Sequence, residues 1–323
     1  MTAVYAPNLV ERRTIESDYW RTYHTAEDLA RFEAIYRTYS IMSTGVSIHI
    51  DAYEQDDPQS PVFIFNHGGG GYSRLFIPIA LALYDKGYTV LVPDQRGQGF
   101  SGGNRSDFTM GQFVENIVDV AKWAQEHYAG ELFMGGGSLG GALTYKAAVA
   151  GAPVKAIVCH NLYDFGNPHD TLAVSIFALI AKYTPIAYLF SLVTRGIGAL
   201  LPTIRLPYKM LARFDQMVDE RNADFYPKYQ HDPIPIKQIS LRYMASTFST
   251  PPARSFEANT LPVLVINQIR DKMVDPVVTH QNYDRLRGEK QYVEIDYGHW
   301  AMDEDFVTEW TDIVDDYLQS HLT

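Results

Sequence analysis

Residues 131–143, ELFMGGGSLGGAL, contain the turn that decides the fold. The apolar run 131–135 is typical of a buried strand, and the pattern over 139–150 is typical of a helix. Ser138 lies at the turn between them, inside the motif G-x-S-x-G. In this context the motif predicts a sharp turn that lifts the hydroxyl out of the sheet, at a helix N-terminus that favours negative charge. We therefore expect Ser138 to be a nucleophile, against the alternative of a glycine-rich turn that happens to contain serine.

Short apolar segments alternate with helical patterns on both sides of this turn. Apolar strands without polar alternation are buried on both faces, and strands that alternate with helices indicate a mainly parallel sheet. We expect strands at 41–50, 61–66, 88–93, 131–135, 154–159, 261–267 and 291–296. We expect helices at 14–39, 74–86, 110–128, 139–150, 276–287 and 304–320. The fold class is therefore α/β.

The alternation stops near residue 160 and returns near residue 260. Between these points the sequence has a helical pattern, is rich in aromatic residues and is punctuated by proline, with no clear strand. We therefore expect one sheet with an insertion. The expected parts are a helical extension at 1–44, a core in two segments at 45–160 and 259–323, and a helical cap at 161–258.

Composition limits the classes of function. The chain has 323 residues, of which 46% are hydrophobic and 20% charged, as in a globular protein with a large core. A net charge of −11 argues against a nucleic-acid partner, because binding a phosphate backbone needs a basic face. The single cysteine, Cys159, excludes an internal disulfide.

No stretch of the sequence predicts a leader or a membrane span. Residues 1–20 lack the apolar core of a secretion signal. The most apolar segment, 171–204, is interrupted by Lys182 and Arg195 and holds no uncharged run of ~18 residues, the minimum for a span. We therefore expect a cytoplasmic protein without stable membrane insertion, in which 171–204 is buried or lines a cleft.

A second glycine-rich segment, NHGGGGY at 66–72, directly follows an expected strand. Such a loop can turn backbone N–H groups toward a developing oxyanion, because glycine has no side chain to block the approach. A flexible loop and a phosphate-binding loop are the alternatives, and the lack of a following P-loop lysine disfavours phosphate. We expect His67 to have a packing or hydrogen-bonding role in this loop.

A serine hydroxyl needs a positioned base, and His299 is the strongest candidate because it follows the last expected strand, beside a glycine. The base needs a carboxylate to fix its tautomer, and both Asp271 and Asp275 follow the preceding strand. Asp275 precedes a proline and has the pattern of a helix N-cap, whereas Asp271 is nearer to the strand end. We therefore expect Asp271 to be the acid, in the chain order Ser–Asp–His.

These segments resemble the α/β-hydrolase superfamily, and within it the group of monoglyceride lipases, lysophospholipases and serine aminopeptidase-like hydrolases. The resemblance covers residues 45–160 and 259–323 and rests on HGG at 67–69, DQRGQGFS at 94–101, GGSLG at 136–140, RDKMVDP at 270–276 and GH at 298–299. It implies an eight-stranded sheet with a cap after the sixth strand, and it implies that Asp271 is the acid. It also implies an oxyanion hole made by the N–H groups of Leu139 and Gly69. The long glycine run leaves Gly70 as an alternative to Gly69.

The expected activity is hydrolysis of a small carboxylic ester, medium-chain or aromatic, through an acyl-enzyme intermediate and without cofactor or metal. The apolar stretch from Leu172 to Phe190 either lines a pocket for the acyl or aromatic group or forms the core of the cap, and His160 could line the cleft. Amide or peptide hydrolysis, carbon–carbon bond hydrolysis and perhydrolysis would use the same triad. A catalytically silent binding protein would share the scaffold. The sequence indicates no oligomeric state.

Overall fold

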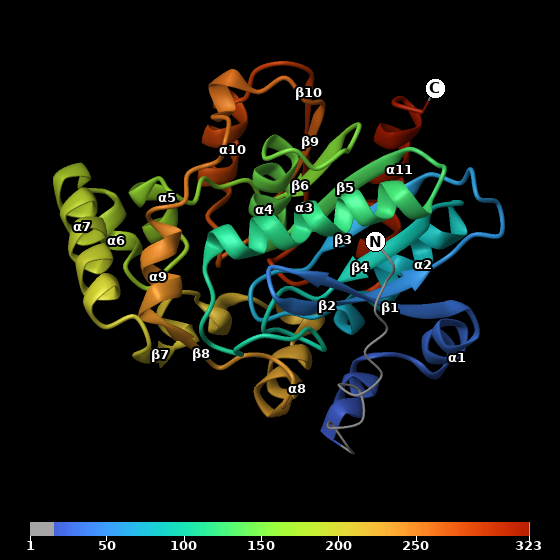
Figure 1. Ribbon diagram of the computed structural model, residues 1–323, viewed down its shortest axis with the longest axis horizontal. Helices are drawn as coiled ribbons and strands as arrows, with labels where there is room; N and C mark the ends of the chain where they lie inside the picture. Colours follow the sequence, from blue (N-terminus) through green and yellow to red (C-terminus); the bar gives the residue numbers. More distant parts are fainter. Residues whose placement is uncertain (1–15, 323) are drawn as a thin grey trace.

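An eight-stranded sheet forms the centre of the protein, whose computed structural model describes residues 16–322 (Figure 1). The strand order is β1-β2-β4-β3-β5-β6-β9-β10, and all neighbours from β4 to β10 are parallel, which confirms the expected sheet. β2 is antiparallel to both of its neighbours. The strands are β1 (Tyr36–Ser43), β2 (Val46–Tyr53), β3 (Val62–Asn66), β4 (Thr89–Pro93), β5 (Leu132–Gly137), β6 (Ile157–His160), β9 (Val263–Gln268) and β10 (Lys290–Ile295).

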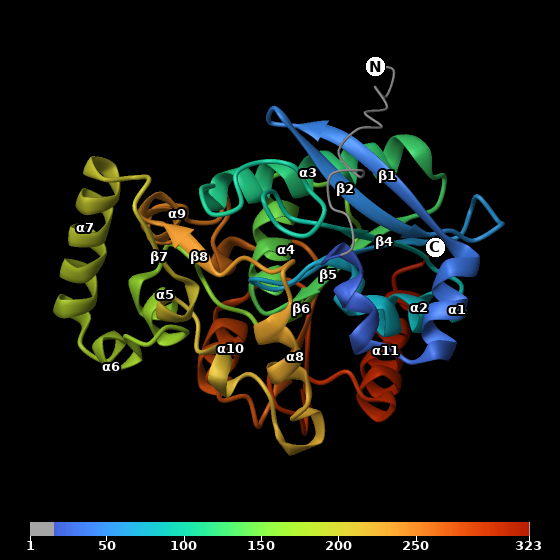
Figure 2. The same cartoon turned by 90° about the horizontal axis from the view of Figure 1, so that it is seen from below.

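Helices cover both faces of this sheet (Figure 2). On one face α2 (Ile77–Asp85) packs against α11 (Glu304–Gln319), and on the other α3 (Met110–His127) packs against α4 (Leu139–Val149). α10 (Pro276–Arg285) lies beside β9. The core strands β3, β4, β6 and β9 are buried along their whole length, which is why they have no polar alternation in the sequence.

The N-terminal segment differs from the expected helix at 14–39, of which residues 14 and 15 lie outside the described residues. The structure has a 3₁₀ helix η1 (Glu16–Tyr23), a helix α1 (Ala26–Ile35) and then strand β1. β1 forms a hairpin with β2 through Thr44 and Gly45, which both have positive φ angles of 47° and 79°. Two such residues make a tight hairpin turn, so pairing with β2 overrides the helical pattern after Ile35.

The segment between β6 and β9 is an irregular helical region at one end of the sheet (Figure 1). Its helices are α5 (Pro168–Ala173), α6 (Ala178–Ala181), α7 (Thr184–Leu200), α8 (Phe225–His231) and α9 (Leu241–Thr247). The 3₁₀ turns of the chain after η1 are η2 (Ser73–Phe76), η3 (Tyr208–Met210), η4 (Phe214–Gln216), η5 (Glu220–Asn222) and η6 (Phe256–Ala258). The division into a core and a cap at 161–258 stays a prediction.

Two further features of this region bear on the cap. A two-stranded antiparallel ribbon joins β7 (Arg205–Pro207) to β8 (Gln238–Ser240), so the expectation of no strands here is wrong. Strands of three residues are too short to show a period in the sequence.

The buried amine of Lys146, on α4, donates to the carbonyls of Phe165 and Thr250 near the two ends of this region, at 2.7 and 2.5 Å. Among residues 16–322, no helix is long and apolar enough to cross a membrane.

Candidate active site

Ser138 lies at a strained turn between β5 and α4. Its φ and ψ angles are 56° and −126°, a backbone conformation that L-residues other than glycine rarely adopt. The backbone N–H of Ser138 donates to the carbonyl of His160 at 2.9 Å, which ties the turn to the end of β6. The side chain therefore stands above the carboxyl edge of the sheet, as the motif predicts.

The glycines on either side of Ser138 are required by close packing. A Cβ atom at Gly136 or at Gly140 would collide with the carbonyl oxygen of Asn66, at the end of β3. The turn can thus sit tightly against the neighbouring strand only with glycine at both positions.

His299 and Asp271 form a buried hydrogen-bonded pair. His299 lies in the loop after β10 and Asp271 in the loop after β9. The Nδ1–H of His299 donates to Oδ2 of Asp271 at 2.6 Å, and both side chains are almost fully buried. This places the proton on Nδ1, so Nε2 has its lone pair free toward the pocket that His299 shares with Ser138.

The Asp271 carboxylate is held in one orientation by three further donors. Its Oδ1 accepts from the backbone N–H groups of Met273 and Val274, both at 2.8 Å. Its Oδ2 also accepts from the amide of Asn161 at 3.3 Å. Asp275 instead caps α10 by accepting from a backbone N–H at 3.0 Å, and its side chain is exposed. The structure thus brings Asp271, and not Asp275, to the histidine.

The glycine loop after β3 leaves one of its central N–H groups available. The N–H of Gly70 donates to Oε1 of Gln98 at 3.0 Å, and the N–H of Gly71 donates to the carbonyl of Gly68. Within residues 16–322, neither Gly69 nor Leu139 has a hydrogen-bond acceptor for its N–H. Both residues border the pockets at Ser138. This geometry favours Gly69 over Gly70 as an oxyanion donor.

His67 fixes the start of the same loop. Its Nε2 accepts from the N–H of Gln95 at 3.0 Å, so its Nδ1 carries the proton and donates to the carbonyl of Gly68 at 2.8 Å. Burial lowers the pKa of His67, which keeps the ring neutral in this role.

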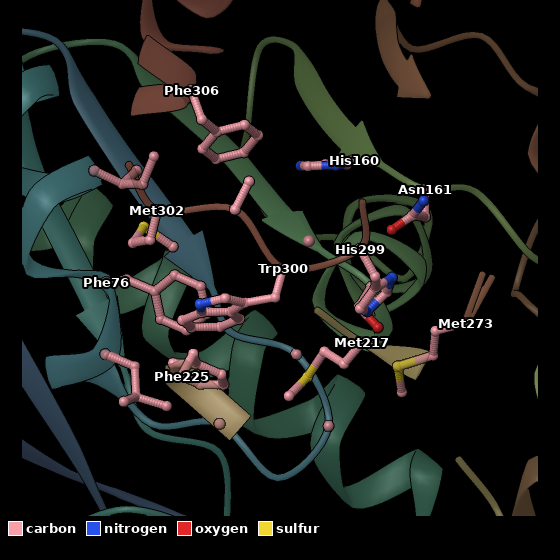
Figure 3. A pocket seen from close by; sticks show the side chains of 18 of the residues that line it. Phe76, His160, Asn161, Met217, Phe225, Met273, His299, Trp300, Met302 and Phe306 are labelled. Carbon is pink, nitrogen blue, oxygen red and sulfur yellow. The ribbon is translucent and has the colours of Figure 1, made fainter. Parts of the chain in front are cut away.

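Two pockets meet at Ser138. The first encloses about 720 Å³ with its open mouth included, and it holds Ser138, Gly69 and His299 on one side. Figure 3 shows Phe76, Phe225 and Trp300 clustered in this pocket; the rings of Phe225 and Trp300 stack with centroids 4.0 Å apart. The second pocket, about 410 Å³, is lined by Ser138, Leu139 and a group of tyrosines: Tyr163, Tyr208 and Tyr243.

The first pocket also contains buried polar atoms without partners. His160 and Trp310 line it, and neither His160 Nε2 nor Trp310 Nε1 has a hydrogen-bond partner among the described residues. Burial lowers the pKa of His160 to about 4, so the ring is neutral near pH 7. The sequence suggested His160 as a cleft residue, and its side chain does line the pocket beside Asn161 (Figure 3).

Of the apolar stretch from Leu172 to Phe190, only Val174 lines a pocket at Ser138, and that is the second pocket. Leu172 instead packs with Ala187 and Phe248 in a small separate cluster, against which Phe177 and Phe190 lie. Other members of the stretch are exposed: Ile176, Leu179, Tyr183, Ile186, Tyr188 and Leu189. The expectation that this stretch as a whole lines an acyl pocket is therefore wrong. The lining comes from later in the insertion, from Phe214, Met217, Phe225 and Tyr229.

Several residues shape the site in ways that the sequence does not indicate, including Gln98 within the motif at 94–101. Gln98 fixes Gly70, Asn161 contacts Asp271, and the Tyr208 hydroxyl lies where a side chain at Gly69 would stand. Asn161 has a positive φ of 65° directly after β6, but such strain is not visible in a sequence. Within the described part of the chain, no group of three or more His, Cys, Asp and Glu side chains is arranged to hold a metal ion.

Comparisons with known proteins agree with this architecture. Residues 61–306 match the family model described as the alpha/beta hydrolase fold. No curated protein matches the chain.

Among solved structures, a monoacylglycerol lipase from Paleococcus ferrophilus has a TM-score of 0.63 and 21% identity, over 80% of this chain and 94% of the lipase. A monoglyceride lipase from Saccharomyces cerevisiae has a TM-score of 0.67 and 13% identity, over 89% and 97%. Est1E from Butyrivibrio proteoclasticus with bound ferulic acid has a TM-score of 0.61 and 18% identity, over 88% and 98%. At these identities the structural matches show a shared fold alone. The family model, in contrast, matches most of the sequence. The chain therefore belongs to the α/β-hydrolase fold family.

Proposed function

We propose that the protein hydrolyses carboxylic esters through a covalent acyl-enzyme on Ser138. The observation that carries this proposal is the His299–Asp271 hydrogen bond of 2.6 Å at the pocket that also holds the strained Ser138. A nucleophile, a base and an orienting carboxylate at one pocket are what acyl transfer by serine requires.

In the proposed mechanism, Ser138 Oγ attacks the ester carbonyl while His299 Nε2 takes its proton. The tetrahedral oxyanion accepts hydrogen bonds from the N–H groups of Leu139 and Gly69, and one such donor is typically worth ~3 kcal/mol. His299 then protonates the leaving alcohol, the C–O bond breaks, and an acyl-Ser138 ester remains. Water, deprotonated by His299, attacks this ester, and the carboxylic acid leaves as the proton returns to Ser138 Oγ. Asp271 holds the tautomer of His299 throughout and stabilises the imidazolium.

The proposed substrates are esters with a medium-chain or aromatic group. Aromatic and aliphatic side chains dominate the larger pocket, which favours an apolar group of the substrate. The structural likeness to lipases, and to Est1E with its bound ferulic acid, agrees with this substrate class.

A fluorophosphonate probe and a Ser138→Ala variant test the nucleophile. We expect the probe to label the wild-type protein and not the variant, and we expect ester turnover to disappear in the variant. Ser249→Ala, at an exposed position between β6 and β9, is the matched control and should keep both signals. Labelling that survives in Ser138→Ala would refute the assignment, and a wild-type protein that takes up no label would favour a silent binding protein.

A series of p-nitrophenyl esters from acetate to decanoate, together with p-nitroanilides, tests the substrate class. We expect kcat/KM to rise from acetate to a medium-chain or aromatic ester, because each buried methylene contributes ~0.8 kcal/mol of transfer free energy. Activity confined to acetate would contradict the apolar pocket as an acyl site. Faster cleavage of the anilides would favour an amide hydrolase.

A further inference from the structure

Helix α7 has small side chains on its inward side and large apolar side chains on its outward side. Its inward side consists of small residues three or four apart, Ala187, Ser191, Thr194 and Gly198, which are buried as α7 packs against α9. A side chain at Gly198 would collide with Ala245 of α9. Packing against α9 therefore already buries the one face that a surface helix normally buries.

The outer face of α7 consists of Tyr188, Leu189, Leu192, Val193, Ile197 and Leu200. Their exposed fractions range from 44% at Ile197 to 81% at Leu200. Arg195 is the only charged residue in the helix. Leu179 and Tyr183, just before α7, are also exposed and extend this apolar surface.

An apolar surface of this size needs an explanation. Single exposed apolar side chains are ordinary, but contiguous patches mark binding surfaces. A helix on the outside of a globular protein usually carries polar residues outward, and a helix that is apolar all round is usually covered. α7 lies at the outer edge of the molecule, and no other element of the described chain lies over it in either view (Figures 1 and 2).

The sequence interval that contains α7 differs in charge from the rest of the chain. No Asp or Glu occurs between Asp170 and Asp215, although the chain as a whole carries a net charge of −11. The same interval contains five cationic residues: Lys182, Arg195, Arg205, Lys209 and Arg213. Lys182, Arg195 and Lys209 are exposed, and none of the three has an ion-pair partner within residues 16–322.

We propose that the outer face of α7 docks on the surface of a phospholipid bilayer. The apolar side chains would enter the boundary between headgroups and acyl chains, and the cations would contact lipid phosphates. α7 has 17 residues, or about 25 Å at 1.5 Å per residue, and would lie in the plane of the interface.

Charge favours a lipid surface over a second copy of the chain. A two-fold dimer places the same surface patch on both sides of its interface, so Lys182 and Arg195 would face a surface with the same excess of cations. An anionic lipid surface would complement these charges.

The first experiment uses the full chain with an environment-sensitive dye. Cys159 is buried, and burial raises the pKa of its thiol to about 12, so it should resist labelling under native conditions. Leu189→Cys places a single reactive thiol on the outer face of α7. Val277→Cys, at a similarly exposed apolar position on α10, is the matched control. With vesicles of phosphatidylcholine and phosphatidylglycerol, we expect a blue-shifted and brighter signal from the dye at position 189 and no change at 277.

The second experiment measures vesicle co-flotation. We expect Leu189→Glu/Leu192→Glu to reduce binding at least tenfold and Val277→Glu to leave it unchanged. Turnover of a soluble short-chain ester should be unchanged in the double variant, since neither residue lines a pocket at Ser138. Lys182→Ala/Arg195→Ala should remove the preference for vesicles that contain phosphatidylglycerol.

Three results would overturn the proposal. One is that the full chain fails to float with vesicles of any of these compositions. Another is an equal response of the dyes at positions 189 and 277. The last is a dimer that light scattering detects without lipid and that Leu189→Glu/Leu192→Glu converts to monomer, while vesicles give no signal. The outer face of α7 would then bind a second copy of the chain.

Discussion

Replacing Asp271 by asparagine exchanges one carboxylate oxygen for an NH₂ group and should invert the tautomer of His299. In the wild-type protein, Oδ1 of Asp271 accepts two backbone N–H groups at 2.8 Å, and Oδ2 accepts from His299 at 2.6 Å. The amide oxygen of the Asp271→Asn variant should keep the two backbone donors, because the reverse orientation would place an NH₂ group against two N–H groups. The NH₂ group then faces Nδ1 of His299. That nitrogen must become an acceptor, and the ring proton moves to Nε2.

With its proton on Nε2, His299 cannot take the proton of Ser138 Oγ. Loss of the correct tautomer in a serine triad lowers kcat by ~10⁴, which is a barrier increase of ~5.5 kcal/mol. The fold should lose only ~1–2 kcal/mol, because the volume is unchanged and two of the hydrogen bonds remain. KM should change little, since Asp271 does not line either pocket.

The assay is steady-state turnover of the best p-nitrophenyl ester, with urea unfolding as the stability measurement. Asp275→Asn is the matched control, four residues further along the chain. Its side chain caps α10, and Asn caps helices about as well as Asp, so we expect less than about a twofold change in rate. Turnover of Asp271→Asn within tenfold of wild type, with the fold intact, would refute the assigned geometry. Equal losses in both variants would refute the choice between the two carboxylates.

Three other changes test separate parts of the structure. Gly69→Ala should lower kcat at least ~10²-fold because its Cβ would collide with the Tyr208 hydroxyl and displace the loop, and Tyr208→Phe added to it should restore part of the rate by removing that oxygen. Stability should fall as the pH drops from 6.5 to 4: burial lowers the pKa of His160 to about 4, so the unfolded chain takes up a proton that the folded chain does not. In the His160→Gln variant, urea unfolding should show that up to ~3 kcal/mol of this pH-dependent loss of unfolding free energy is absent. A pH profile of stability equal to that of the wild-type protein would contradict this role of His160. Lys146→Met should cost ~2–4 kcal/mol of unfolding free energy, because the buried carbonyl of Phe165 and the half-buried carbonyl of Thr250 lose their donor. A loss under ~1 kcal/mol would show that they find other partners.

The sequence predicted those parts of the fold that depend on local pattern. The strands around Ser138 are buried on both faces and therefore appear as apolar runs, and the positions of Asp271 and His299 just after strands follow from the same pattern. Their meeting at one edge follows from the parallel sheet.

Other parts depend on contacts between distant segments. β1 begins at Tyr36 because it pairs with β2, although the sequence predicts a helix up to residue 39 and a strand only from residue 41. The wall of the larger pocket depends on Phe225 and Trp300, which stack although they are far apart in the sequence. The sequence also does not predict that the apolar residues of α7 are exposed, because an apolar helix is more often buried than exposed.

The meeting of two pockets at Ser138 has a consequence for the proposed acyl-enzyme. An acyl group held in one pocket leaves the other open next to the same carbonyl carbon. An alcohol bound there would compete with water for the acyl group and would give a new ester instead of an acid. We expect the share of ester among the products to rise with the concentration of a small alcohol, and product analysis would measure this partition between alcohol and water.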